Sequence, residues 1–213
     1  MFGPHLGRDY WHPHVLSAMA AVQRHHHVPA AWMRLAYADA PLPVDGGTTT
    51  SQPLVVALMT DLLDVLNTHH VLEIGTGLGY ATAVLARLSA KVATIEVDPA
   101  LAQEARRRLL ASGVENVTYG IGDGHLGWPE IGSVDRIVVT GATDIIPKAW
   151  LNQLRPGGRL VVPTGLPGAQ HLMIVKKDAD GHLQSTNLMP VRFAALRKSA
   201  QGHVGPLKQE HLI

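Results

Sequence analysis

The sequence predicts an α/β protein built on a twisted, mostly parallel sheet with helices on both faces. From residue 71 to residue 163, apolar runs of strand length alternate with segments of helical length. Such alternation favours right-handed βαβ units, which place successive strands parallel in one sheet. A glycine-rich turn directly follows the first apolar run, and open sheets of this kind bind ligands at the carboxyl ends of their strands. The 213 residues are enough for one such domain with appendages.

The individual elements follow from periodicity and from turn residues. We expect strands over 71–75, 91–96, 117–121, 135–140 and 159–163, and helices over 80–88, 99–111 and 147–154. Two more apolar runs, 171–176 and 191–196, flank the turn signal Asp178-Ala179-Asp180-Gly181. They predict an antiparallel strand pair at the C-terminal end of the sheet.

The N-terminal part predicts a small helical extension. We expect a short helix over 17–24, one or two helical turns between 28 and 43, and a polar loop over 45–53. A further helix begins near Pro53, a residue suited to a first helical turn, and carries apolar residues at helical spacing. Residues 1–16 show no clear period, and we expect them to be poorly ordered.

Composition excludes several classes of protein. The net charge is +1, which argues against a dedicated nucleic-acid surface, and the basic run Arg106-Arg107-Arg108 is typical of a solvated helix face. The chain has no cysteine, hence no disulfide, thiol nucleophile or cysteine–metal site. We find neither a signal peptide nor an apolar run near ~20 residues. We therefore expect a cytoplasmic monomer that binds neither nucleic acid nor membrane.

The most informative segment is Val71-Leu72-Glu73-Ile74-Gly75-Thr76-Gly77-Leu78-Gly79-Tyr80. Glycines let the backbone adopt positive φ and approach a ligand closely. The dinucleotide fingerprint G-x-G-x-x-G does not match, because the third glycine comes one residue early and Tyr80 stands in its place. The E-x-G-x-G-x-G spacing instead resembles the first motif of S-adenosylmethionine (SAM) methyltransferases.

Acids at the ends of the next two strands fit the same cofactor. Glu96 lies about twenty residues after the glycine loop, where a carboxylate accepts hydrogen bonds from ribose hydroxyls. Asp123, in Gly122-Asp123-Gly124, is placed to accept from an adenine amino group. Glu73 is a buried acid that needs backbone N–H donors or water, and it shapes the loop. The full set of candidate cofactor residues is Thr49, Thr50, Glu73, Gly75, Thr76, Gly77, Gly79, Glu96, Val97, Asp123, Gly124 and Thr140, the last with plain packing as an equal alternative.

Residues from Arg24 to Leu196 resemble the protein-L-isoaspartate O-methyltransferase family. The most specific segments are Pro41-Leu42-Pro43, Thr49-Thr50-Ser51-Gln52-Pro53 and Gly122-Asp123-Gly124-His125-Leu126-Gly127-Trp128-Pro129. The resemblance implies a Rossmann-like SAM methyltransferase fold and methylation of the side-chain carboxylate of L-isoaspartyl residues in damaged proteins. The ester then cyclises to a succinimide, which can hydrolyse to aspartate. We expect one compact unit with two parts: residues 1–53, the N-terminal helical extension with the substrate and catalytic loop, and residues 54–213, the SAM-binding domain.

The family's T-I-S-x-P pattern places its catalytic serine at Ser51, with Thr50 in place of the isoleucine. From the residues alone, the preferred role of Ser51 is to cap the helix that follows, and both roles can hold together. The chain departs from the family pattern at residues 25–27, 141–143 and 194–195, where the family shapes its peptide pocket. Two other functions therefore remain alternatives: a carboxyl methyltransferase for another peptide or small molecule, and a non-catalytic SAM-binding adaptor.

Histidines near the N-terminus raise the question of a metal. His25, His26 and His27 are consecutive, so their side chains cannot all point to one centre on a strand or helix. They have no cysteine or obvious carboxylate beside them. We predict no metal, and a histidine of this run is a candidate for lining the substrate cleft.

Overall fold

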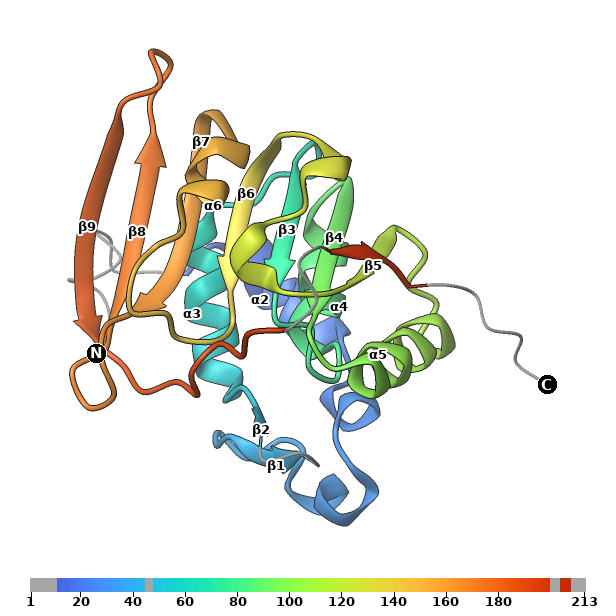
Figure 1. The fold of residues 1–213 in the computed structure, drawn as a ribbon. Helices are drawn as coiled ribbons and strands as arrows, with labels where there is room; N and C mark the ends of the chain where they lie inside the picture. Colours follow the sequence, from blue (N-terminus) through green and yellow to red (C-terminus); the bar gives the residue numbers. More distant parts are fainter. Residues whose placement is uncertain (1–10, 45–47, 200–203, 208–213) are drawn as a thin grey trace.

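The computed structural model describes residues 11–44, 48–199 and 204–207. An eight-stranded sheet runs through it in the order β10-β5-β4-β3-β6-β7-β8-β9 (Figure 1). The five strands from β5 to β7 are parallel, and β8, β9 and β10 are antiparallel to their neighbours. The strands are β3 (His70–Ile74), β4 (Lys91–Glu96), β5 (Val117–Ile121), β6 (Val134–Val139), β7 (Leu154–Thr164), β8 (His171–Lys177), β9 (Leu183–Pro190) and β10 (Gly205–Pro206). The predicted mostly parallel α/β sheet is confirmed.

Helices cover both faces of the sheet, as predicted. The α-helices are α2 (Pro13–Ala21), α3 (Pro53–Leu63), α4 (Tyr80–Leu88), α5 (Pro99–Ala111) and α6 (Lys148–Gln153), and the 3₁₀ turns are η1 (Arg24–His27), η2 (Ala30–Leu35), η3 (Gly124–Leu126) and η4 (Pro129–Ile131). Helices α2, α3 and α4 pack with one face of the sheet, and α6 packs with the other (Figure 1). Val71 and Leu72 of β3 belong to different cores, because successive side chains of a strand point to opposite faces.

The predictions for α4, β4, α5 and β5 are confirmed to the residue. The N-terminal predictions are partly wrong. Helix α2 begins at Pro13 and ends at Ala21, because proline starts a helix well, and residues 24–27 form the separate 3₁₀ turn η1. Residues 13–16, expected to be poorly ordered, lie in α2, where Val15 is buried; residues 1–10 lie outside the described residues.

The polar loop over 45–53 is also only partly right. Thr48–Thr50 forms β2 and pairs antiparallel with β1 (Leu42–Val44), while residues 45–47 lie outside the described residues. This hairpin forms a two-stranded sheet of its own and stands below the main sheet in Figure 1. It carries the predicted substrate loop to the start of α3.

The antiparallel C-terminal pair is confirmed, but its second strand was assigned to the wrong residues. β9 covers Leu183–Pro190 directly after the turn, and residues 191–196 form no regular strand. The reason is that β9 is a mostly exposed edge strand with four consecutive polar residues, 184–187, so it shows no apolar alternation. The 191–196 segment instead crosses the carboxyl ends of the strands, where Ala195 makes an isolated parallel bridge to Ala142.

Candidate active site

A cavity of about 1120 Å³ lies at the carboxyl ends of the parallel strands. Its described lining includes the glycine loop, the ends of β4 and β6, the hairpin loop and residues 189–197. Of the predicted site residues, it brings together Thr49, Ser51, Gly75, Gly77, Glu96, Val97, Gly124 and Thr140. A ligand pocket for a drug-sized molecule occupies about 300–1,000 Å³. The cavity therefore has room for a cofactor and part of a second molecule.

The glycine loop has the backbone conformation that the sequence predicts. Gly75, Gly77 and Gly79 have φ of 99°, 56° and 83°, which L side chains rarely adopt. A Cβ on Gly75 would lie 2.2 Å from Oγ1 of Thr140, whereas a Cβ on Gly77 would meet nothing within 4 Å. Gly77 therefore opens toward ligand space, and Gly75 permits close contact with β6. The Thr140 hydroxyl donates to the Gly75 carbonyl (2.6 Å), so Thr140 both lines the cavity and holds the loop.

Glu96 is fixed at the end of β4 beside this loop. Its Oε2 accepts from the N–H of Gly77 (2.9 Å), and its Oε1 accepts from the N–H groups of Val97 (2.9 Å) and Asp98 (3.2 Å). Arg197 approaches Oε1 to 3.7 Å from the segment that crosses the cavity. Backbone donors thus orient the carboxylate, which lines the cavity where a ribose is expected.

Glu73 lies behind the glycine loop and is fully buried. The expectation of backbone N–H donors is wrong: the hydroxyls of Thr82 and Thr94 donate to its Oε2. Its Oε1 has no hydrogen-bond partner among the described residues. Burial raises the pKa of Glu73 to about 7, and the two hydroxyls oppose this rise only in part. The Thr76 hydroxyl continues the network at 2.6 Å from Oγ1 of Thr94. Neither Glu73 nor Thr76 is among the described residues that line the cavity.

Asp123 follows β5 but turns toward the protein. Its Oδ1 accepts from the backbone N–H (3.0 Å) and from Nδ1 (2.7 Å) of His125, and its Oδ2 accepts from the N–H of Ser199 (3.4 Å). Burial favours a higher pKa for Asp123, but the His125 hydrogen bonds outweigh burial and lower it. Its neighbours Gly122 and Gly124 line the cavity, whereas the Asp123 side chain is not part of the described lining. The adenine contact of Asp123 stays a prediction.

Ser51 lines the cavity just before α3. The alternative that Ser51 caps this helix is wrong, because the N-cap is Gln52 and makes no side-chain cap. Asp39 takes that part instead: its carboxylate accepts from the N–H of Leu54 (3.0 Å) and from Nε2 of Gln52 (2.8 Å). The Ser51 side chain is therefore not needed for helix capping.

Sequence reasoning missed Arg24, which organises the substrate loop. Its buried guanidinium donates to the carbonyls of residues 36 (2.6 Å), 38 (3.3 Å) and 40 (3.1 Å). It also donates to Oγ1 of Thr50 (2.9 Å) and to the carbonyl of Ser51 (2.9 Å). The Thr50 hydroxyl is thus occupied by Arg24 and is not part of the described lining. The string Arg24-His25-His26-His27-Val28-Pro29 contains Arg24. Its pattern could not reveal the partners of Arg24, because these are mainly backbone carbonyls.

The histidine run does not line the cavity in the described part of the chain. His27 is buried, and its Nδ1 donates to the carbonyl of Leu78 in the glycine loop (3.1 Å). Burial lowers the pKa of His27 to about 4, so its ring is neutral near pH 7. His25 contacts the hydroxyl of Tyr37 at 2.6 Å instead. His27 therefore stabilises the glycine loop through a hydrogen bond to its backbone.

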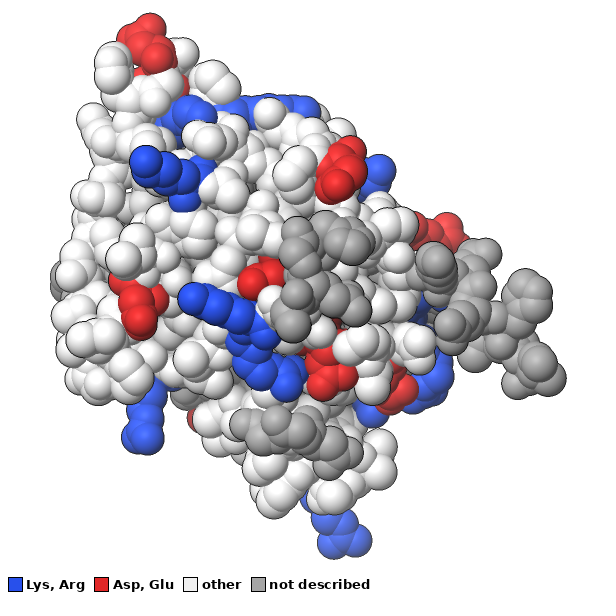
Figure 2. All heavy atoms as spheres, in the orientation of Figure 1, with Lys and Arg blue, Asp and Glu red and all other residues white. Residues whose placement is uncertain are grey.

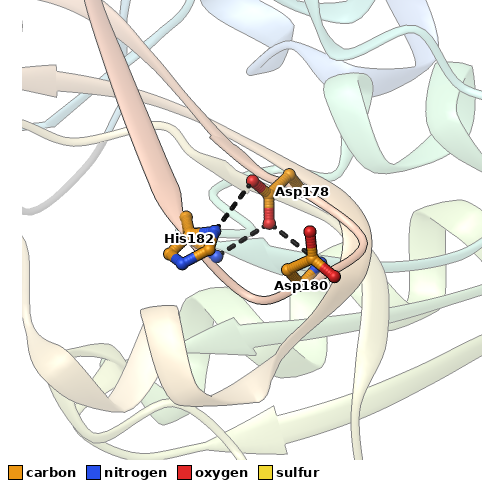
Figure 3. A group of neighbouring side chains, drawn as sticks. All are labelled: Asp178, Asp180 and His182. Carbon is orange, nitrogen blue, oxygen red and sulfur yellow. Dashed lines mark hydrogen bonds and ion pairs between the residues drawn. The ribbon is translucent and has the colours of Figure 1, made fainter.

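Among the described residues, one group of three side chains has metal-ligand spacing: Asp178, Asp180 and His182 (Figure 3). All three are exposed in the β8–β9 turn. The Asp178 carboxylate accepts from the backbone N–H groups of Asp180 (3.0 Å) and His182 (2.8 Å), which is the hydrogen bonding of an Asx turn. The hydrogen bonds of the turn therefore account for the closeness of the three side chains.

The surface carries charges of both signs. On the face drawn in Figure 2, Lys and Arg side chains are interspersed with Asp and Glu. Within the described ranges, no helix has both the length and the apolar character needed to cross a bilayer.

The sheet, the glycine loop with positive φ and the acid at the end of β4 together define the class of SAM-dependent methyltransferases. A family model described as protein-L-isoaspartate(D-aspartate) O-methyltransferase (PCMT) matches residues 7–201. The chain belongs to this family.

Individual relatives agree with the family match. A protein-L-isoaspartate O-methyltransferase 1 of Polaromonas sp. is 47% identical over 197 residues, covering 92% of this chain and 84% of its own. The protein of the same name from Nitrosospira multiformis is 49% identical over 184 residues, covering 86% and 78%.

Solved structures show the same fold. A protein-L-isoaspartate O-methyltransferase superposes with a TM-score of 0.78 and 31% identity, covering 91% of this chain and 63% of that longer one. A β-aspartate methyltransferase from Plasmodium falciparum, in complex with S-adenosyl-L-homocysteine (SAH), has a TM-score of 0.76. At 22% identity, it supports the fold alone.

Proposed function

We propose that the protein is a SAM-dependent carboxyl O-methyltransferase that methylates L-isoaspartyl residues of damaged proteins as a repair step. Family membership supports this function, together with one observation: a single cavity is lined both by the glycine loop with Glu96 and by Ser51. A cofactor held at the first group of residues and an acceptor held at Ser51 would therefore meet.

The residues fit SAM. The open space above Gly77 admits the amino-acid part of a ligand against the backbone, and the oriented Glu96 carboxylate is suited to two ribose hydroxyls. When bound, SAM supplies an electrophilic methyl group on a positively charged sulfur. Gly75, Gly77, Glu96 and Val97 would hold it, with Asp123 and Gly124 near the adenine.

The remaining task of the chain is to orient the acceptor. A carboxylate is already ionised at pH 7, so the reaction needs no strong general base. Ser51 is proposed to donate its hydroxyl to one carboxylate oxygen and so direct the other along the line of attack. Correct orientation can contribute several kcal/mol, up to about 7–11 in model reactions. Arg24 fixes the Ser51 backbone through the carbonyl, which leaves the hydroxyl available for the acceptor.

The division of the chain at residue 53 is part of the same proposal, with residues 1–53 on the acceptor side and 54–213 on the cofactor side. Residues 189–197 also line the cavity, and we assign 189–196 to the acceptor side, since only Arg197 at the end of this segment approaches Glu96. A monomer working in the cytoplasm without nucleic acid remains a prediction from composition.

The test is methyl transfer from labelled SAM to an isoaspartyl peptide and to its aspartyl twin. We expect transfer to the isoaspartyl peptide alone. Transfer to both peptides, or to another carboxylate only, would favour the related carboxyl methyltransferase. SAH binding without transfer to any carboxylate would favour the adaptor.

The variant Ser51→Ala tests the assigned role. It should keep its melting temperature and its affinity for SAH, and should lose about 10–1000-fold in single-turnover rate, the scale of one oriented donor. Ser133→Ala, at an exposed serine, is the matched control and should behave as wild type. A Ser51→Ala protein with wild-type turnover would remove Ser51 from the mechanism.

A further inference from the structure

Gln170 is a buried amide, 5% exposed, that neither the sequence analysis nor the proposed mechanism uses. It stands immediately before β8 and lines the cavity. Its Oε1 accepts from the N–H of Phe193 (2.7 Å), and its Nε2 donates to the carbonyl of Phe193 (3.1 Å). One side chain thus satisfies both polar groups of one residue's backbone, as a neighbouring strand would.

This contact comes where regular pairing ends. The β8–β9 ladder closes at His171 and Pro190, and the next hydrogen bond joins the N–H of Val191 to the carbonyl of Gln170 (3.0 Å). Beyond Val191, no strand in the described part of the chain pairs with the segment. The Gln170 amide therefore replaces the missing strand neighbour.

The other support of the segment lies three residues further on. Ala142 donates to the carbonyl of Ala194 (2.8 Å) and accepts from the N–H of Leu196 (2.7 Å). A Cβ on Gly141 would lie 3.1 Å from the Cα of Leu196, so the segment packs closely on the loop after β6. Gln170 and Ala142 thus hold the segment from two sides, and residues 189–197 between and around them line the cavity.

We propose that Gln170 is a positioning residue for the acceptor: it fixes the cavity wall formed by residues 191–196 without touching the reacting atoms. This inference rests on the proposed function. β8 stands four places from β4 in the sheet, which at about 4.8 Å per strand is roughly 19 Å from the ribose acid. Arg197, which approaches Glu96 to 3.7 Å, lies beyond the two Ala142 hydrogen bonds, and these stay in place without Gln170. Loss of Gln170 should therefore affect the acceptor side of the cavity much more than cofactor binding.

The variant Gln170→Ala removes both hydrogen bonds to Phe193. We expect the KM for an isoaspartyl peptide to rise about 10–100-fold, the scale of two lost hydrogen bonds. The Kd for SAH, measured by calorimetry, should stay within about two-fold of wild type, because the ribose site is remote. Gln184→Ala, at an exposed position of β9, is the matched control and should change neither quantity. An unchanged peptide KM, or an equal loss of SAH affinity, would overturn the proposal.

The variant Gln170→Glu keeps the size of the side chain and the acceptor for the Phe193 N–H, but its ionised form cannot donate to the Phe193 carbonyl. Hydrogen exchange of the Phe193 amide should then be as slow as in wild type, whereas it should be faster in Gln170→Ala. Because a buried carboxyl can keep its proton and then still donate, the peptide KM of Gln170→Glu should rise as the pH is increased and the carboxyl ionises. A KM that matches wild type over the whole pH range would contradict a role for the donor. If Gln170→Ala does not fold, these two measurements on Gln170→Glu decide the proposal.

The two proposals fail in different ways. A wild-type protein that does not methylate the isoaspartyl peptide contradicts the proposed function. Hydrogen exchange at Phe193 and SAH affinity need no turnover, so they still report whether Gln170 holds the segment. Faster hydrogen exchange of the Phe193 amide in Gln184→Ala would contradict the hydrogen bonds between Gln170 and Phe193. Exchange as slow as wild type in Gln170→Ala would contradict them too.

Discussion

Arg24 offers the most direct test of how the substrate loop is held. The guanidinium connects three carbonyls of residues 36–40 to Thr50 and Ser51, and its Cζ lies 5.6 Å from the centre of the Tyr80 ring. The variant Arg24→Met keeps a long side chain of similar reach but removes every donor. Its five acceptors then lose one partner each.

The magnitude depends on which acceptors water can reach. The contacts to Ala36 and Thr50 are buried, whereas the other three are partly buried. A buried polar group left without a partner costs about 1–3 kcal/mol, so the two buried acceptors together cost about 2–6 kcal/mol. Hydration compensates most of the loss at the remaining carbonyls. We expect a stability loss near the middle of that range, about 4 kcal/mol.

Urea unfolding of Arg24→Met should show this loss, with Arg34→Met as the matched control at an exposed arginine nearby. Turnover under folding conditions should fall as well, since the Ser51 backbone loses its anchor. SAH affinity should fall less than turnover, because Glu96 and the glycine loop lie on elements to which Arg24 makes no hydrogen bond. A variant with wild-type stability and wild-type turnover would refute the view that Arg24 organises the loop.

Two other carboxylates give sharp predictions. Glu96→Ala should weaken SAH binding by about 1.5–3 kcal/mol, the value of a hydrogen bond to a charged group. Calorimetry measures the affinity, with Glu115→Ala as the control at an exposed glutamate. An unchanged SAH affinity in Glu96→Ala would exclude the ribose role. Glu73 ionises near pH 4.5 when unfolded but near 7 when folded, because burial raises its pKa. The stability that its neutral form contributes is therefore present below pH 4.5 and declines up to pH 7, by about 3 kcal/mol in total. Glu73→Gln should lack this decline. Urea unfolding at pH 5 and at pH 8 measures it, and an equal change in unfolding free energy between the two pH values in both proteins would contradict the prediction.

Much of the central fold follows from local pattern. The run from β3 to β5 was predicted closely, because β3 and β4 are buried on both faces and the helices begin at clear signals such as Pro99. The residues of β9 were assigned wrongly, because an edge strand with polar side chains leaves no apolar period. The glycine loop and Glu96 carry their own chemical signature, so their place in the cavity could be predicted.

The supporting residues of the site could not be predicted in this way. Arg24, Asp39 and Gln170 act mainly on backbone groups of residues 12–27 positions away. A backbone carbonyl or N–H is the same in every residue, so no residue type marks the partner. Only the folded chain shows which arginine, aspartate or glutamine reaches it. Ser51 was assigned through the family resemblance, since its own residue type also fits a helix cap.

The short strand β10 has a consequence for how the molecule meets its own copies. It covers one border of the sheet, where Gly205 and Pro206 pair with Ile121 and Gly120 of β5. An uncovered border strand offers a row of free peptide groups to any passing chain, and this is a common start of aggregation. Proline has no N–H, so Pro206 gives an incoming strand no donor at that position. Shortening the chain before residue 204 would expose β5 and remove that protection.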